Sequence, residues 1–132
     1  MASKILLTLG TLIYCIAPLF ADLNSSHVHH PEWTPHARLH MVWLLSVSAS
    51  IGVLALYQIW LRGNELLAGV LGWIVLGSFW VAALTKDSYG GALADDGGLE
   101  RLIMGLNGNV FGFGVATMLI VAGLILHHRN QS

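Results

Sequence analysis

The sequence predicts an all-α fold: a polytopic membrane protein with four transmembrane helices in an antiparallel bundle, formed by residues 1–132 as a single membrane domain. Two observations predict this class. Hydrophobic residues make up 55% of the chain and charged residues only 10%, whereas soluble domains carry about 25% charged residues. The apolar residues also gather in four runs that lack Asp, Glu, Lys and Arg. A helix needs about 17 to 25 such residues to cross a bilayer, and the runs cover residues 5–21, 39–61, 66–84 and 102–126.

The same composition excludes several functional classes. The chain has six Lys and Arg residues and seven Asp and Glu residues, which gives a formal charge of −1. No basic patch for nucleic acid is therefore expected, and the apolar content excludes a disordered chain. Cys15 is the single cysteine, so neither an internal disulfide nor a thiolate cluster can form. The expected partners are the lipid bilayer, a small lipophilic substrate and further copies of the chain.

The first apolar run follows Lys4, as the apolar region of a secretory signal peptide does. A small residue is normally found three places before the cleavage site. The residues before Asp22 are Leu19, Phe20 and Ala21, which do not provide one. We therefore expect residues 5–21 to be kept as the first helix, with a cleaved signal peptide as the alternative.

The segments between the runs differ in length. Residues 62–65 predict a tight turn that joins the second and third helices as an antiparallel pair. Residues 22–38 and 85–101 form two long loops on the opposite face of the membrane. Lys and Arg are split evenly between the two faces, so the positive-inside rule does not set the orientation. The positively charged short ends favour both termini in the cytoplasm, as in a multi-pass protein of the bacterial inner membrane.

The first long loop leads into a cluster of histidines. Pro35 can occupy the first turn of the second helix, with Thr34 as its N-cap. His36 and His40 then lie one turn apart on one helix face, where two imidazoles can bind a transition metal. Alternatively, the histidines form an interfacial girdle with the nearby tryptophans. Five of the seven histidines belong to this cluster: His27, His29, His30, His36 and His40.

The second long loop carries carboxylates and a phenol that can take part in catalysis. Asp87 and Tyr89 are candidate catalytic residues, because the loop shares a face with the histidines and an acid–base pair needs such groups close together. Asp87 or Asp95 is also a candidate metal ligand beside the histidines. The alternative is a flexible connector in which the glycines make turns.

The fourth run contains amides and a stripe of small residues. Asn107 and Asn109 need polar partners in an apolar segment, which makes them candidates for holding a ligand oxygen in catalysis. The small residues allow either close helix packing or the approach of a flat cofactor. They are Gly105, Gly108, Gly112 and Ala116.

Two resemblances add to these patterns. The stretch from Asp22 to His40 resembles uncharacterised small four-helix membrane proteins, which implies the architecture alone. The four-helix plan, the long first loop and the sequence Ala37-Arg38-Leu39-His40 resemble the styrene oxide isomerase family, which has Ala-Arg-x-His there. That resemblance implies that His40 is the axial ligand of haem b held between subunits of a trimer. Ferric iron would then act as a Lewis acid that turns an epoxide into a carbonyl.

The expected function is therefore a membrane-embedded isomerase or lyase that acts on a small lipophilic substrate. On this hypothesis His40, Gly108 and Gly112 bind the cofactor. Two alternatives remain open: a histidine-rich protein that binds a transition metal other than in haem, as a carrier or small metalloenzyme, and an accessory or assembly subunit of a larger membrane complex.

Overall fold

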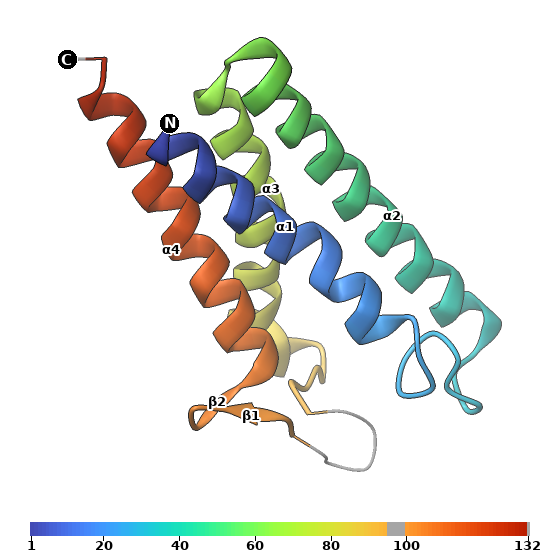
Figure 1. Cartoon of the computed structure of the whole chain (residues 1–132). Helices are drawn as coiled ribbons and strands as arrows, with labels where there is room; N and C mark the ends of the chain where they lie inside the picture. The colour runs from blue at the N-terminus through green and yellow to red at the C-terminus, as the bar shows by residue number, and fades with distance from the viewer. Residues whose placement is uncertain (95–99, 132) are drawn as a thin grey trace.

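The computed structural model describes residues 1–94 and 100–131. Four helices dominate it, each long enough and apolar enough to cross a membrane. Consecutive helices run in opposite directions, so that both termini and the α2–α3 turn lie at one end (the termini end) and the long loops at the other (the loop end) (Figure 1). The elements are α1 (Ala2–Asp22), α2 (Pro35–Tyr57) with a π-helical turn (Gln58–Arg62), α3 (Glu65–Thr85) with a 3-10 turn (Lys86–Ser88), β1 (Leu102–Ile103), β2 (Leu106–Asn107) and α4 (Gly108–Arg129).

Local capping signals set the beginnings of α2 and α3. The Thr34 hydroxyl accepts a hydrogen bond from the amide of Ala37 at 3.2 Å, which confirms the predicted N-cap. Gly63 has a φ of 65°, a left-handed conformation that glycine adopts without strain. The Asn64 side chain then accepts from the amide three residues further on at 3.0 Å. The tight turn between the second and third helices is therefore confirmed.

The fourth helix begins later than the sequence predicts. We expect a helix from residue 102, but residues 102–107 form an antiparallel hairpin in which Leu102 pairs with Asn107. Met104 and Gly105 at its tip have φ values of 52° and 82°, which no right-handed helix contains. Asn107 then caps α4. The apolar run misplaced the boundary because hydropathy does not distinguish a short apolar hairpin from a helical turn.

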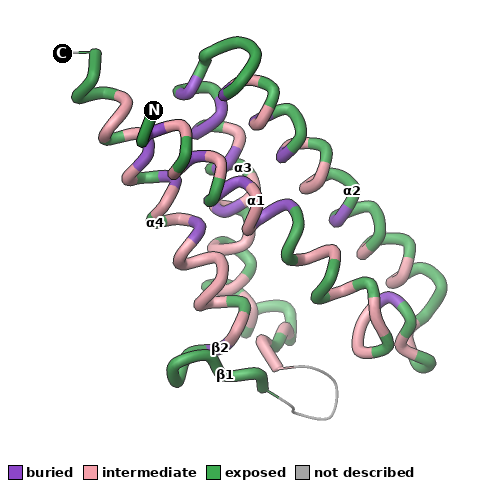
Figure 2. Tube along the Cα trace, in the orientation of Figure 1, coloured by how far each residue is buried: buried purple, intermediate pink, exposed green. Residues whose placement is uncertain are grey.

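The buried core occupies the termini end of the molecule. Most of the buried positions in Figure 2 lie there, where the helices converge. The largest fully buried side chains are Tyr14, Leu7, Ile59, Leu76, Ile120 and Thr11. Because these residues come from all four helices, the termini end is closed by packed side chains.

Close helix packing depends on glycines other than the predicted ones. The most extensive contact is between α1 and α4. There, a Cβ atom on Gly10 would lie 3.1 Å from the backbone oxygen of Ala116, and one on Gly123 would lie 2.8 Å from Leu7 Cγ. A Cβ atom on Gly112, by contrast, would meet nothing within 4 Å. The predicted stripe therefore does not bring two helices together at Gly112, and its member Gly105 lies in the hairpin.

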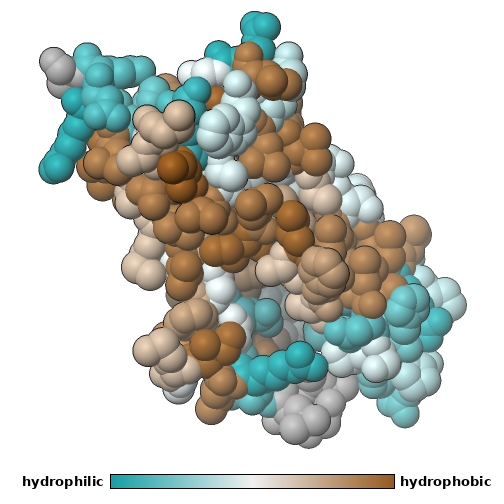
Figure 3. All heavy atoms as spheres, in the orientation of Figure 1, coloured by the Kyte–Doolittle hydropathy of each residue, from teal (hydrophilic) through white to brown (hydrophobic). Residues whose placement is uncertain are grey.

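The outer surface divides into an apolar middle and two polar ends. Brown apolar side chains cover the middle of the face in Figure 3, and teal hydrophilic side chains gather at the termini end and the loop end. Large apolar side chains such as Leu39, Trp43, Val53, Val81 and Met118 are exposed on this surface. Such a belt is what hydrocarbon contact favours on a helical protein.

Candidate functional site

A cavity of about 630 Å³ lies between the four helices toward the loop end. Sites for small molecules usually enclose about 300–1,000 Å³, so this volume fits one small ligand. Phe79 and Phe113 stack on each other in its wall, with ring centroids 4.1 Å apart. The wall is mostly apolar and includes Ile13, Met41, Val47, Ile51, Ile74 and Val75.

Polar side chains of the cavity wall come largely from the ends of helices and from the loops. They are Asp22, Ser26, His27, Arg101, Asn107 and Asn109, together with Ser48 and Ser78 from within the helices. The backbone amide of Val28 bonds the Asp22 carbonyl at 3.1 Å, which folds the loop back against the end of α1. The cavity therefore has an apolar interior and a polar rim.

A chain of hydrogen bonds orients the His27 ring in this rim. The Ser26 hydroxyl lies 2.7 Å from Asn24 Oδ1 and 2.8 Å from His27 Nδ1. Because Asn24 Oδ1 only accepts, the hydroxyl donates to it, and Nδ1–H of His27 then donates to Ser26 Oγ. This assignment, made from the bonding pattern, leaves Nε2 as the basic nitrogen of the neutral ring. Nε2 lies 3.7 Å from Asp22 Oδ1, so a proton on Nε2 forms an ion pair there.

His36 and His40 lie outside the cavity, on the exposed surface of α2. Their Nε2 atoms are 3.0 Å apart, which confirms that the two rings share one face of the helix. Trp43 lies one turn further along, with its ring centroid 5.9 Å from that of His40. His40 borders only a shallow surface hollow with Trp43, Leu44 and Val47.

The candidate residues of the fourth run do line the cavity. Asn107 is 9% exposed and works as a structural hub: its oxygen accepts from the amides of Asn109 and Val110, and its nitrogen donates to Leu93 O and Glu100 Oε1. The Asn109 side chain makes no hydrogen bond with the described residues, so its amide is available at the rim. Gly108 and Gly112 also border the cavity.

The structure places Asp87 and Tyr89 away from the cavity wall. Asp87 is exposed and pairs with Lys86 Nζ at 2.6 Å. The Tyr89 hydroxyl donates to the carbonyl of Ala82 at 2.8 Å. The Tyr89 bond holds the loop after α3 against its own helix, whereas the Asp87 pair stays within the 3-10 turn. Asp95, the other candidate carboxylate, lies outside the described residues.

Three rim residues were not expected as site residues, namely Asp22, Ser26 and Arg101, whereas His27 was expected only as one of several histidines that could bind a metal. The signal for Asp22 and His27 was a carboxylate at the end of a predicted helix, five residues before a histidine. In the sequence His27 was one of five similar histidines, and only the folded loop separates it from the others. Arg101 had no distinguishing pattern.

The described residues do not bring the three predicted haem-binding residues, His40, Gly108 and Gly112, to one pocket within the chain. His40 lies on the outer surface of α2, whereas Gly108 and Gly112 line the inner cavity, so the three residues do not share one pocket. The part of the chain that the structure describes also contains no group of three or more His, Cys, Asp or Glu side chains suited to a metal ion. The His36–His40 pair offers two ligands.

Comparison with known proteins gives a family without a known activity. No curated protein and no solved structure matches the chain. Residues 6–129 match the model of a family of unknown function, DUF6640, and the chain therefore belongs to that family.

Proposed function

We propose that this chain spans a membrane four times as an antiparallel bundle, with both long loops on one side and the termini in the cytoplasm. The four apolar helices and the exposed apolar belt support insertion. Lipid tails can solvate this belt, whereas the helices satisfy their own backbone hydrogen bonds.

The function we propose is the binding and isomerisation of a small lipophilic molecule in the inner cavity. One observation carries the proposal: an apolar cavity of about 630 Å³ has a histidine and a carboxylate in its rim. Lipid tails are as apolar as the cavity wall, so moving an apolar ligand from the bilayer into the cavity contributes little to the binding free energy. Close packing and the rim polar groups must provide the selectivity.

Proton transfer is the chemistry that these side chains support. In the proposed reaction, His27 Nε2 removes a proton from the substrate and returns it to another atom of the same molecule. Asp22 stabilises the protonated ring and Ser26 holds its orientation. The Asn109 amide donates to a substrate oxygen on which negative charge develops. The reaction is balanced without water or a redox partner, as an isomerisation requires.

Filling the cavity tests the binding step. Gly112→Leu places a side chain into the cavity, because a Cβ atom there meets nothing within 4 Å. Gly114→Leu is the matched control: its Cβ atom also meets nothing within 4 Å, but Gly114 does not line the cavity. In detergent micelles, the neutral fluorophore 1-aminoanthracene should bind to the wild type and to Gly114→Leu and lose binding in Gly112→Leu. Equal binding by both variants would contradict the cavity assignment.

Deuterium incorporation tests the proton-transfer step. A panel of lipophilic unsaturated ketones is incubated with the protein in heavy water, and each ketone is analysed by mass spectrometry. The wild type should introduce deuterium into at least one of them. His27→Gln should abolish this exchange and still bind 1-aminoanthracene. Exchange that persists in His27→Gln would refute the role of the ring.

Metal binding by His36 and His40 is a second candidate function. Their Nε2 atoms are 3.0 Å apart, and zinc–nitrogen bonds are about 2.0–2.1 Å long, so one ion can contact both. Two protein ligands leave the remaining positions to water or to a second copy of the chain. Such sharing would fit the homo-oligomer, for example a trimer, that the sequence leads us to expect.

A further inference from the structure

We infer that the ligand of the inner cavity is a single-chain amphiphile whose carboxylate head group binds Arg101 at the rim. The inference rests on the proposed binding function and names the class of molecule that the cavity takes. It starts from a basic side chain at the cavity that has no acidic partner among residues 1–94 and 100–131.

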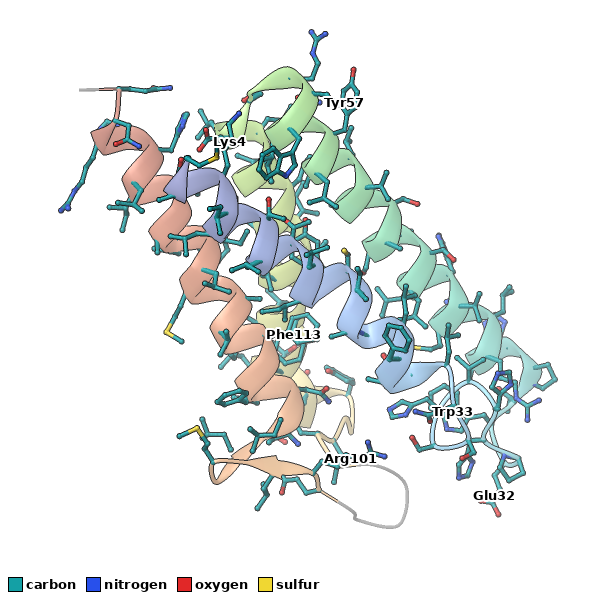
Figure 4. The ribbon with its side chains drawn as sticks, in the orientation of Figure 1. Lys4, Glu32, Trp33, Tyr57, Arg101 and Phe113 are labelled. Carbon is teal, nitrogen blue, oxygen red and sulfur yellow. The ribbon has the colours of Figure 1, made fainter. Side chains whose placement is uncertain are left out.

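Arg101 is fixed beside the cavity by its own backbone. Its carbonyl accepts a hydrogen bond of 2.7 Å from the amide of Gly108, the first residue of α4. A Cβ atom on Gly108 would lie 3.2 Å from that oxygen, so glycine allows the close approach. In Figure 4 the Arg101 side chain extends from the hairpin toward the loop that follows α1. The guanidinium group therefore stands at the rim between two elements that border the cavity.

Two described acids, the sequence neighbour of Arg101 and an acid of the same cavity wall, have other contacts. Glu100 accepts a hydrogen bond from Asn107 at 3.1 Å, and Asp22 faces His27 at 3.7 Å. The guanidinium group makes no ion pair or side-chain hydrogen bond with the residues that the structure describes. An arginine at the mouth of an apolar cavity thus offers five N–H donors to whatever enters.

Carboxylate is the head group that fits these donors. A planar guanidinium binds carboxylate through two parallel hydrogen bonds, which a hydroxyl group cannot form. The amide of Asn109 and the positive N-terminal end of α4 lie on the same rim and favour negative charge as well. A cavity with an apolar interior and a cationic rim thus matches a molecule with one apolar chain and one anionic end.

The test compares two ligands that differ in the head group. The full chain is placed in nanodiscs of phosphatidylcholine, and binding of radiolabelled dodecanoate and dodecanol is measured by equilibrium dialysis against empty nanodiscs. The wild type should bind dodecanoate more tightly by roughly 10- to 100-fold, the range for a charge-assisted pair. Arg101→Gln should reduce dodecanoate binding to the level of dodecanol and leave dodecanol binding unchanged.

Two further variants keep the test interpretable. Arg129→Gln removes the same charge at the opposite end of α4 and should keep the preference. Arg101→Lys keeps the charge without the paired donors and should give an intermediate preference. Dodecanol that binds as tightly as dodecanoate, or a preference that survives in Arg101→Gln, would overturn the head-group inference and leave cavity binding intact. If neither ligand exceeds empty nanodiscs and 1-aminoanthracene also fails to bind, both proposals are refuted.

Discussion

Replacing Asn107 should release the hairpin, the preceding loop and the first turn of α4 together. Its side-chain oxygen accepts from the amides of Asn109 and Val110 at 2.9 and 3.4 Å, and its nitrogen donates to Leu93 O and Glu100 Oε1 at 3.0 and 3.1 Å. Asn107→Ala removes the N-cap and both donated bonds at a buried position. The three segments lose the one side chain that joins them.

The size of the effect follows from these contacts. Loss of an N-cap costs about 1 kcal/mol, and each neutral hydrogen bond contributes about 0.5–1.5 kcal/mol. The bond to Glu100 counts no more than a neutral one, because that carboxylate is exposed to solvent. Asn107→Ala should therefore lower the free energy of local opening by roughly 2–4 kcal/mol, which corresponds to roughly 30- to 1,000-fold faster amide exchange.

Two substitutions of Asn107 keep the capping oxygen and remove the donated hydrogen bonds, so they separate the effect of the cap from that of these bonds. Asn107→Ser retains the capping oxygen and loses both amide-donated bonds, so it should weaken protection by roughly 1–3 kcal/mol. Asn107→Asp is an equally good cap but places a second carboxylate beside Glu100. It loses the same two donated bonds as serine and adds a like-charge contact, so it should be more damaging than serine although aspartate is among the best capping residues.

Hydrogen–deuterium exchange mass spectrometry of the peptides over residues 100–112 measures this opening. Asn109→Ala is the matched control, because its side chain makes no hydrogen bond with the described part of the chain and should change exchange by about twofold or less. If Asn107→Ala exchanged no faster than Asn109→Ala, the hub role would be refuted. If Asn107→Asp matched the wild type, the donated bonds would contribute nothing.

Three further predictions concern other parts of the molecule. His36→Ala and His40→Ala should each abolish the Zn²⁺ binding that isothermal titration detects in the wild type, since neither imidazole alone chelates; retained binding in either variant would exclude the pair. Gly123→Leu should destabilise the protein by about 1–3 kcal/mol through overpacking between α1 and α4, measured as a lower midpoint in SDS titration. An unchanged midpoint would show that α1 and α4 are not closely packed at Gly123. Glu65 is 8% exposed, and its Oε2 lies 3.3 Å from Nδ1 of His127 at the end of α4. Glu65→Leu should therefore be better tolerated in the same titration than His127→Ala, because His127→Ala leaves a buried carboxylate without its partner. The reverse order would contradict a buried ion pair.

Local signals in the sequence were sufficient for much of the fold. The four apolar stretches predicted four long helices, and Thr34 with Pro35 predicted the beginning of α2. The spacing of His36 and His40 predicted that their rings share a face. Each of these features depends on residues within one or two turns of each other, so the sequence contains the necessary information.

The cavity depends on contacts that no local pattern describes. Because α2 is apolar on all sides, amphipathicity does not show which face turns inward. The sequence favoured His40 over His27, and only the packing of α2 against α1 and α3 places His40 outside the cavity. The beginning of α4 was misplaced for a similar reason, since the apolar hairpin continues the hydropathy of the helix.

Packing that closes only one end of the four helices has a dynamic consequence. The core residues anchor the helices at the termini end, whereas α2 and α4 make no contact with each other in the described residues. Pro18 lies inside α1 at the cavity wall, where it removes one backbone hydrogen bond and weakens the helix against bending. Bending at Pro18 would widen the loop end and leave the core intact. If the cavity takes its ligand from a bilayer, as proposed, this widening would let the ligand exchange without unfolding of the core.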